Sequence, residues 1–330
     1  MKTIFVSGGT GSFGKSFLKK ILNEKKDLKK IIVFSRDEFK QYSLKSELLS
    51  HKNFNKMRFL IGDIRDRERL NTALENVDTV IHAAALKQVD TAEYNPSEFI
   101  KTNILGTQNI VDASIYHNIK KVIFLSTDKA TSPINLYGAT KLCAEKIILT
   151  ANNIKGKKGI VFSVVRYGNV TSSRGSVIPV FNKQKKDGLI KITDPKMTRF
   201  NISLNESVAF VIKVAGLAKG GEIFVPKMSS YNLKDLANAI APNVKKKIIG
   251  LRPGEKIHEE LVGKHESGNT FDFGKYYVII NSYNSKLFNY YKSLKNSLKV
   301  KPNFIYTSDN NPNRLSLSQI KKKLLYKNDI

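Results

Sequence analysis

The chain is poor in cysteine and in long hydrophobic runs. Its 330 residues include one cysteine, Cys143, so no disulfide can form within the chain, which agrees with a reducing compartment. No apolar run approaches the roughly 20 residues that cross a bilayer. The first residues lead directly into a short apolar run and glycines, unlike a signal peptide. We therefore expect a cytoplasmic protein with no membrane partner.

Acidic residues are also scarce. The chain has 28 Asp and Glu against 56 Lys and Arg, a formal net charge of +28. Such a charge attracts nucleic acid, a membrane surface or a phosphate-bearing substrate. The lysines are spread over every segment, however, and no common nucleic-acid-binding motif is present. We interpret the charge as lysine-rich solvated surface with modest steering of a doubly charged substrate, and we predict no nucleic-acid partner.

Short β-branched runs alternate with segments of helical period in the first half of the chain. This alternation favours an α/β fold, a Rossmann-type doubly wound parallel sheet with helices on both faces. The strands are expected at 3–7, 31–34, 58–61, 78–82, 121–125 and 160–166, and the helices at 14–23, 38–49, 67–75, 97–115 and 137–153.

The regularity weakens after about residue 170. We therefore predict a core domain over 1–170 and a smaller C-terminal α/β substrate-binding lobe over 171–330, with segments returning to the core sheet and a basic tail. Within the second half the sequence predicts a loop at 171–177, helices at 203–218, 232–241 and 315–321, and a strand at 248–251.

A glycine-rich loop joins the first expected strand to the first helix. Gly8, Gly11 and Gly14 fit G-x-x-G-x-x-G, and Gly9 in place of Gly8 gives G-x-G-x-x-G. Such glycines let backbone approach a pyrophosphate, while the helix N-terminus supplies N–H donors. The loop is thus a predicted dinucleotide cradle, with contacts expected from Gly8, Thr10, Gly11, Ser12, Phe13 and Gly14.

The residues after the next strands bear on which dinucleotide binds. Ser35 and Arg36, with Lys40 nearby, suit the 2'-phosphate of NADP, whereas Asp37 keeps NAD as the less favoured alternative. Asp63 and Ile64 are expected at the adenine edge. The small residues Ala83, Ala84 and Ala85 let the cofactor pass close to the backbone.

His82 precedes these alanines, and it is one of only five histidines in the chain. No cysteine or second histidine lies at metal-ligand spacing from it. We predict no metal site and interpret His82 as a hydrogen-bonded structural side chain.

The strongest chemical signal lies between residues 127 and 141. Tyr137 and Lys141 are four apart and share a helix face. An ammonium beside a phenol stabilises the phenolate, so Tyr137 is a candidate base toward a sugar hydroxyl. Thr127 is placed to hydrogen-bond the reacting oxygen. Asp128 and Lys129 add an acid/base pair that a plain dehydrogenase does not need.

Together these motifs resemble the extended short-chain dehydrogenase/reductases that act on nucleotide sugars. Within that family the chain is similar to the inverting UDP-N-acetylglucosamine 4,6-dehydratases, the type that begins pseudaminic acid synthesis. Relatives that retain configuration at C5 carry Glu where this chain has Lys129. The resemblance spans residues 4 to about 260 and rests on the strings 8–14, 35–38, 82–87, 126–141, 166–170, 173–177, 198–200 and 252–256.

The resemblance implies C4 oxidation, elimination of water across C5 and C6, and reduction at C6 with tightly bound, recycled NADP. It implies that Lys129, made neutral by burial and by cations such as Lys87, removes the C5 proton while Asp128 protonates the leaving hydroxyl. The product is UDP-2-acetamido-2,6-dideoxy-beta-L-arabino-hex-4-ulose. Relatives assemble into symmetric oligomers, so a homo-oligomer, dimer or hexamer, is expected. Family positions add the cofactor contacts Lys87 and Asn103 and the UDP-sugar contacts Lys87, Asn169, Ser176, Val177, Thr193, Met197, Arg199, Arg252 and Glu255.

Two alternatives remain open. A nucleotide-sugar 4-epimerase needs Tyr137 and Lys141 but no pair like Asp128 and Lys129. A non-catalytic NADP-binding or nucleic-acid-binding protein would account for the charge, and it predicts no turnover of a UDP-sugar.

Overall fold

The computed structural model describes residues 1–171, 176–281 and 283–325. The loop predicted at 171–177 therefore falls largely outside the described residues, as does most of the string at 173–177.

The first half of the chain forms six parallel strands of one sheet, and all six predicted strands are present. The spatial order is β3-β2-β1-β4-β5-β6, with β1 in the interior. Strand residues of β1, β2 and β4 to β6 are almost all buried, as expected for strands covered on both faces. The strands are β1 (Thr3–Ser7), β2 (Lys30–Ser35), β3 (Met57–Ile61), β4 (Thr79–His82), β5 (Lys121–Thr127) and β6 (Val161–Tyr167).

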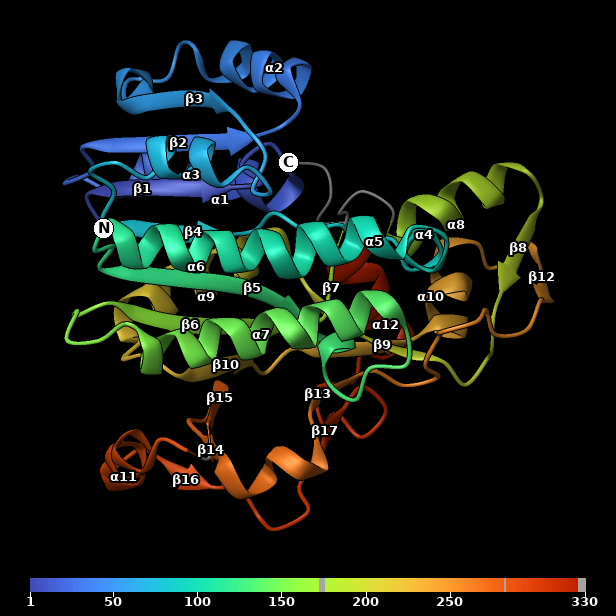
Figure 1. Ribbon diagram of the computed structural model, residues 1–330. Helices are drawn as coiled ribbons and strands as arrows, with labels where there is room; N and C mark the ends of the chain where they lie inside the picture. The colour runs from blue at the N-terminus through green and yellow to red at the C-terminus, as the bar shows by residue number, and fades with distance from the viewer. Residues whose placement is uncertain (172–175, 282, 326–330) are drawn as a thin grey trace.

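Helices cover both faces of this sheet. In Figure 1, α6 and α7 lie in front of the strands and α9 behind them. The helices of this part are α1 (Ser12–Glu24), α2 (Glu38–Leu48), α3 (Arg67–Ala73), α4 (Val89–Tyr94), α5 (Pro96–Phe99), α6 (Gly106–Tyr116) and α7 (Leu136–Ile154). The helix predicted at 97–115 is divided, because a π-helical stretch, Ile100–Leu105, separates α5 from α6.

Segments beyond residue 170 extend the same sheet. Strand β10 (Glu222–Pro226) pairs in parallel with β6, and β15 (Tyr276–Ile280) pairs antiparallel with β10. Strands β14 (Thr270–Asp272) and β16 (Leu298–Lys299) complete this edge. The division into a core domain and a substrate lobe stays a prediction.

Among the described residues, three small sheets lie outside the large one. In the first, β9 (Thr198–Ile202) lies between β11 (Ser229–Asn232) and β7 (Asn169–Val170). The other two pair β12 (Lys245–Ile248) with β8 (Leu189–Ile192) and β13 (Glu260–Val262) with β17 (Tyr306–Thr307). The remaining helices are α8 (Val177–Lys186), α9 (Leu204–Leu217), α10 (Leu233–Ile240), α11 (Ser285–Ser293) and α12 (Leu317–Ile320).

Of the elements predicted after residue 170, the structure confirms the helices but shifts the strand. The helix at 203–218 is confirmed with its capping box of Ser203 and Glu206, and α10 confirms the helix at 232–241. The strand predicted at 248–251 is wrong by about three residues, because pairing with β8 selects Lys245–Ile248 and Gly250, at φ +83°, ends the extended backbone. The terminal helix begins at Leu317 and continues as a π-helical turn over Lys321–Leu325.

Within the described residues, none of the helices combines the length and apolar character needed to cross a membrane.

Candidate functional site

A cavity of about 550 Å³ opens at the carboxyl ends of β1, β4, β5 and β6. Ligands of open parallel sheets bind at this edge. The cavity brings together the glycine loop, two of the three alanines and the whole set from Thr127 to Lys141 that the sequence singled out. Its lining includes Gly8, Thr10, Gly11, Ser12, Phe13, Gly14, Lys40, Ala83, Ala85, Lys87, Thr127, Asp128, Lys129, Tyr137, Lys141, Asn169 and Ser176.

The glycine loop leaves no room for side chains. Gly8 has φ +69°, and a Cβ there would lie 2.9 Å from the backbone nitrogen of Ala84. A Cβ at Gly14 would lie 2.5 Å from the carbonyl oxygen of Gly9. Helix α1 starts after Gly11 without a side-chain cap, so its first N–H groups remain available to an anion. The loop fits a dinucleotide pyrophosphate on these grounds.

The residues after β2 form local contacts. Asp37 caps α2 by accepting from the backbone N–H of Lys40 (2.9 Å), and the ammonium of Lys40 pairs with the same carboxylate. Ser35 accepts from the side chain of Gln41. Arg36 is half-exposed and lies 3.6 Å from Asp63. Asp37 is therefore engaged at the helix start, while the guanidinium of Arg36 stays accessible.

Asp63 follows β3 and is held by arginines. Burial alone would raise the pKa of Asp63, but the hydrogen bonds and charge of Arg65, together with the charge of Arg36, lower it. Ile64 is buried in the core against Gly106.

His82 is confirmed as a structural side chain. Its Nδ1 lies 2.7 Å from Ser7 Oγ and its Nε2 3.0 Å from Thr107 Oγ1, so both ring nitrogens have partners. Burial, with the nearby charge of Lys141, lowers the pKa of His82 to about 3. The described residues contain no group of three side chains that could hold a metal ion.

Asn103 is buried and holds in place a segment that lines the cavity. Its amide exchanges two hydrogen bonds with the backbone of Leu86, both 2.9 Å, and donates to Thr140 (3.0 Å). It thus fixes the segment that follows Ala85 against α7. The predicted cofactor contact of Asn103 stays a prediction.

Close packing between α7 and the turn after β5 assembles the centre of the cavity. Asp128 to Ala130 form a 3-10 turn, and a Cβ at Gly138 would lie only 2.2 Å from the carbonyl oxygen of Lys129. The absence of a side chain at Gly138 therefore lets the start of α7, with Tyr137, approach Lys129.

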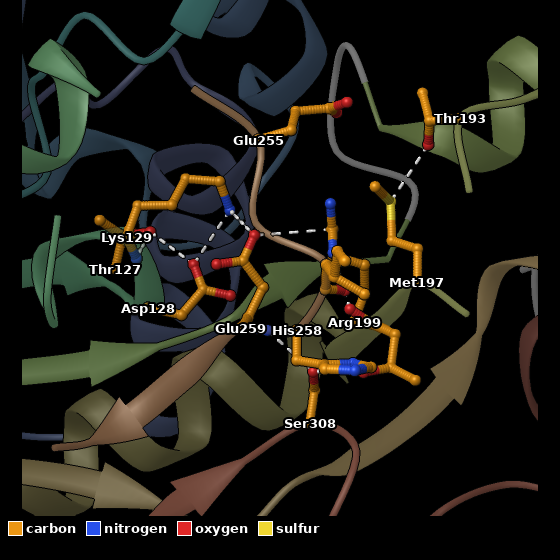
Figure 2. Close-up of polar contacts among 12 residues, drawn as sticks. Thr127, Asp128, Lys129, Thr193, Met197, Arg199, Glu255, His258, Glu259 and Ser308 are labelled. Atoms are coloured by element: carbon orange, nitrogen blue, oxygen red, sulfur yellow. Dashed lines mark hydrogen bonds and ion pairs between the residues drawn. The ribbon is translucent and has the colours of Figure 1, made fainter. Parts of the chain in front are cut away.

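Lys129 lies between two carboxylates (Figure 2). Its Nζ is 3.1 Å from Asp128 Oδ1 and 3.1 Å from Glu259 Oε1. Arg199 approaches the same Glu259 oxygen at 3.6 Å. Sequence reasoning missed Glu259. It belongs to the adjacent pair Glu259 and Glu260, and no local spacing connects it with Lys129.

The charges in this cluster shift one another. Burial raises the pKa of Asp128, and the neighbouring Glu259 raises it further. Burial would lower the pKa of Lys129, but Asp128 and Glu259 outweigh it and raise the pKa. The expectation that burial and cations such as Lys87 make Lys129 neutral is therefore wrong for the ligand-free protein, because two carboxylates hold the ammonium.

Tyr137 and Lys141 also differ from expectation. Burial raises the pKa of Tyr137 to about 12, although the charge of Lys129 and a hydrogen bond with Thr127 oppose the rise. Burial lowers the pKa of Lys141 to about 7. Lys141 Nζ donates to the carbonyl oxygen of Leu125 (2.7 Å) and lies 3.9 Å from the centre of the Phe124 ring. The predicted stabilisation of the Tyr137 phenolate by Lys141 stays a prediction.

The predicted substrate residues separate into two groups. Lys87, Asn169 and Ser176 line the cavity, and Val177 opens α8 beside it. The others have partners within the protein: Thr193 contacts Met197 and Arg252 contacts Glu255, while Arg199 pairs with Glu259 and Arg252 also lies 3.5 Å from Asp90. Their role in binding substrate stays a prediction.

Comparison with known proteins shows the family of the chain. The family model described as "Polysaccharide biosynthesis protein" matches residues 4–281. The chain is 51% identical over 319 residues to the UDP-N-acetylglucosamine 4,6-dehydratase (inverting) of Campylobacter jejuni subsp. jejuni serotype O:23/36 (strain 81-176), covering 94% of this chain and 93% of the relative. It is 42% identical to the UDP-glucose 4-epimerase of Rickettsia bellii (strain OSU 85-389), covering 98% and 95%.

Solved structures share the fold. Pen from Bacillus thuringiensis superposes with a TM-score of 0.90 and 40% identity, covering 98% of this chain and 97% of that one. DesIV, a dTDP-glucose 4,6-dehydratase from Streptomyces venezuelae solved with NAD and TYD bound, has a TM-score of 0.68 and 21% identity, covering 77% and 86%. The Rossmann-type fold predicted from the sequence is confirmed.

Proposed function

We propose that this chain, which belongs to the polysaccharide biosynthesis protein family among the extended short-chain dehydrogenase/reductases, dehydrates UDP-N-acetylglucosamine at C4 to C6 with inversion at C5. The observation that carries the proposal is the ion pair of the buried Asp128 with the partly exposed Lys129 in the same cavity as Tyr137. The product would enter a pseudaminic acid-type synthesis.

NADP is the proposed cofactor. The glycine loop would hold its pyrophosphate, and the accessible guanidinium of Arg36 suits a 2'-phosphate. The bound dinucleotide would supply the oxidant for C4 and the reductant for C6. NAD is the less favoured alternative, because the carboxylate of Asp37 is already used to cap α2.

Tyr137 is proposed to take the proton from the C4 hydroxyl. A phenol with a pKa of about 12 needs help to ionise at neutral pH. The ammonium of Lys129 and the hydroxyl of Thr127 both lower that pKa, so they assist the phenolate in the proposed reaction. Lys141 would orient the cofactor ribose.

The elimination needs one base and one acid on the same sugar. In the ligand-free protein Lys129 is an ammonium, so it must first lose a proton. Transfer of that proton to a carboxylate at 3.1 Å leaves a neutral amine. The amine then takes the C5 proton, the C5–C6 double bond forms, and Asp128 as a carboxylic acid protonates the leaving C6 oxygen as water. The raised pKa of Asp128 favours this acid role.

The first test is turnover of UDP-N-acetylglucosamine without added cofactor, followed by NMR of the product in heavy water. We expect a 4-keto-6-deoxy sugar with inverted C5 that carries deuterium. Substitution of Lys129 by Ala is expected to lower kcat at least about 100-fold while NADP binding persists. Full activity of the Lys129→Ala protein would exclude Lys129 as the base.

A 4-epimerase is the second candidate, favoured by the 42% identity to a protein named UDP-glucose 4-epimerase. An epimerase conserves the mass of its substrate, whereas the dehydratase product is lighter by one water. Mass spectrometry of the product separates the two.

We also propose a cytoplasmic homo-oligomer, dimer or hexamer. Exposed apolar side chains on and beside α4 to α6, among them Tyr94, Ile100, Leu105 and Tyr116, support a self-association surface.

A further inference from the structure

Two buried carboxylates compete for one ammonium in the cavity. Lys129 Nζ lies 3.1 Å from each of Asp128 Oδ1 and Glu259 Oε1, and the two carboxylate side chains are 1% and 3% exposed. Either carboxylate is therefore within reach of the proton that Lys129 must lose. The proposed dehydration works only if Asp128 receives it, because Asp128 is the acid that protonates the leaving oxygen.

The surroundings of Glu259 differ from those of Asp128 in positive charge. Arg199 Nε lies 3.6 Å from Glu259 Oε1. The guanidinium is fixed, because Arg199 also donates to the carbonyl oxygens of Thr198 (2.8 Å) and Ile257 (3.1 Å). The backbone of Glu259 is fixed as well, by reciprocal hydrogen bonds with Ser308. Glu259 therefore faces two cations in a rigid arrangement, which favours its ionised form.

Asp128 has a free position for a proton. Its Oδ1 accepts from Thr127 (2.9 Å) and Lys129 (3.1 Å). Its Oδ2 is buried and has no hydrogen-bond partner among the described residues, and the same holds for Glu259 Oε2. A buried oxygen without a donor can carry a proton in either carboxyl group, so the positive charge of Arg199 beside Glu259 is what makes Asp128 the favoured acceptor.

We propose that Glu259 is a positioning residue that stays ionised and directs the proton of Lys129 to Asp128. This inference rests on the proposed dehydratase function. One N–H bond of Lys129 breaks and one O–H bond of Asp128 forms, so the pair becomes neutral without loss of a proton. Glu259 accepts a hydrogen bond from the remaining N–H and holds the amine in place.

The directions of the pKa shifts agree with this assignment. Burial raises the pKa of Asp128, and the charge of Glu259 adds to the rise. Burial would raise the pKa of Glu259 too, but Lys129 and Arg199 outweigh it and lower the pKa. The other titratable groups that act on the cluster are Tyr137 on α7, Tyr231 on β11 and Lys256.

The first experiment measures the two carboxyl groups directly in the ligand-free, full-length protein. Carboxyl ¹³C labelling of Asp and Glu gives NMR titrations, with the two signals assigned by their loss in Asp128→Asn and Glu259→Asp. We expect Asp128 to titrate at higher pH than Glu259. The reverse order would overturn the proposal. Because no substrate is present, this result is independent of whether the chain dehydrates UDP-N-acetylglucosamine.

The second experiment removes the charge. In Glu259→Gln the titration midpoint of Asp128 is expected to move to lower pH. The value of kcat is expected to fall about tenfold or more, and its decline at high pH is expected to begin at a lower pH than in wild type. Glu259→Asp keeps the charge and is expected to restore the midpoint, with kcat between the two. The control Glu260→Gln changes the adjacent carboxylate, which does not contact Lys129. It is expected to leave both the titration midpoint of Asp128 and kcat unchanged. An unshifted Asp128 midpoint in folded Glu259→Gln protein would contradict the proposal.

Discussion

At the scale of single residues, surroundings decide the charge of each ionisable group in the cavity. Lys129 and Lys141 both line the cavity, Lys129 partly exposed and Lys141 buried, yet their pKa values shift in opposite directions. Lys129 faces two carboxylates, whereas Lys141 faces a carbonyl oxygen and a ring. Because the partners differ, the same residue type is an ammonium at one position and close to half-neutral near pH 7 at the other.

The buried His82 gives a pH dependence of stability. Its pKa is about 3 in the folded chain against an ordinary 6.5, so between these values the unfolded chain binds a proton that the folded chain does not. Stability therefore falls as the pH falls through this window. We expect His82 to lower the free energy of unfolding by about 2 kcal/mol between pH 7 and pH 5.

Urea unfolding of wild type and His82→Asn at both pH values checks this contribution. The variant is expected to be less stable at pH 7, because it loses partners, but to lose less stability on acidification. Equal losses in the two proteins would show that His82 is not the group responsible.

At the scale of elements, the function depends on how closely α7 packs on the turn after β5. Gly138 is the contact point, since a Cβ there would lie 2.2 Å from the carbonyl oxygen of Lys129. The atom in conflict is backbone, so a rotamer change cannot relieve it and the helix or the turn must move. Such a movement would separate Tyr137 from Lys129.

Gly138→Ala is therefore expected to lower kcat on the order of 100-fold, the loss typical of a displacement of about 1 Å in a catalytic group. The measurement is steady-state dehydration alongside thermal unfolding. Gly216→Ala in α9 is the matched control, because a Cβ there meets nothing within 4 Å, and its kcat is expected to be unchanged. A Gly138→Ala protein with normal kcat would show that the close packing is not needed.

At the scale of the whole molecule, one buried arginine joins the two halves of the chain. Arg166 on β6 donates to Glu145 on α7 (2.6 and 3.0 Å), to Glu266 (2.8 and 2.9 Å) and to the carbonyl oxygen of Leu261 (3.0 Å). The three guanidinium nitrogens and the five oxygens that accept from them would be costly to leave without partners in the interior.

Arg166→Met is expected to destabilise the protein by about 3–5 kcal/mol, because it leaves two buried carboxylates without a cation. Denaturant unfolding measures the loss. Arg67→Met, which removes a largely exposed arginine 3.9 Å from Asp112, is expected to cost less than about 1 kcal/mol. Similar losses for both would mean that the buried network adds little.

The sequence predicts well where the signal is local. The first six strands and the residues from Thr127 to Lys141 follow from periodicity and short spacings, and the structure brings them to one cavity. The sequence does not predict contacts between residues that lie far apart along the chain. Glu259 carries no spacing signal, and the protonation of Lys129 follows from that contact. The strand Lys245–Ile248 forms because it pairs with β8, and its own lysine-rich sequence does not predict a strand there.

The strands of the large sheet do not lie side by side in the order in which they occur along the chain. When the ribosome has produced residues up to Tyr167, strand β6 is an open edge, because its neighbour β10 is encoded more than fifty residues later, at Glu222–Pro226. Val164 and Val165 of β6 then pair with β5 but have no strand on their other side. Until β10 adds to it, β6 is an exposed edge of the kind that can pair with another chain, so β10 and the strands beyond it protect this edge as well as extend the sheet.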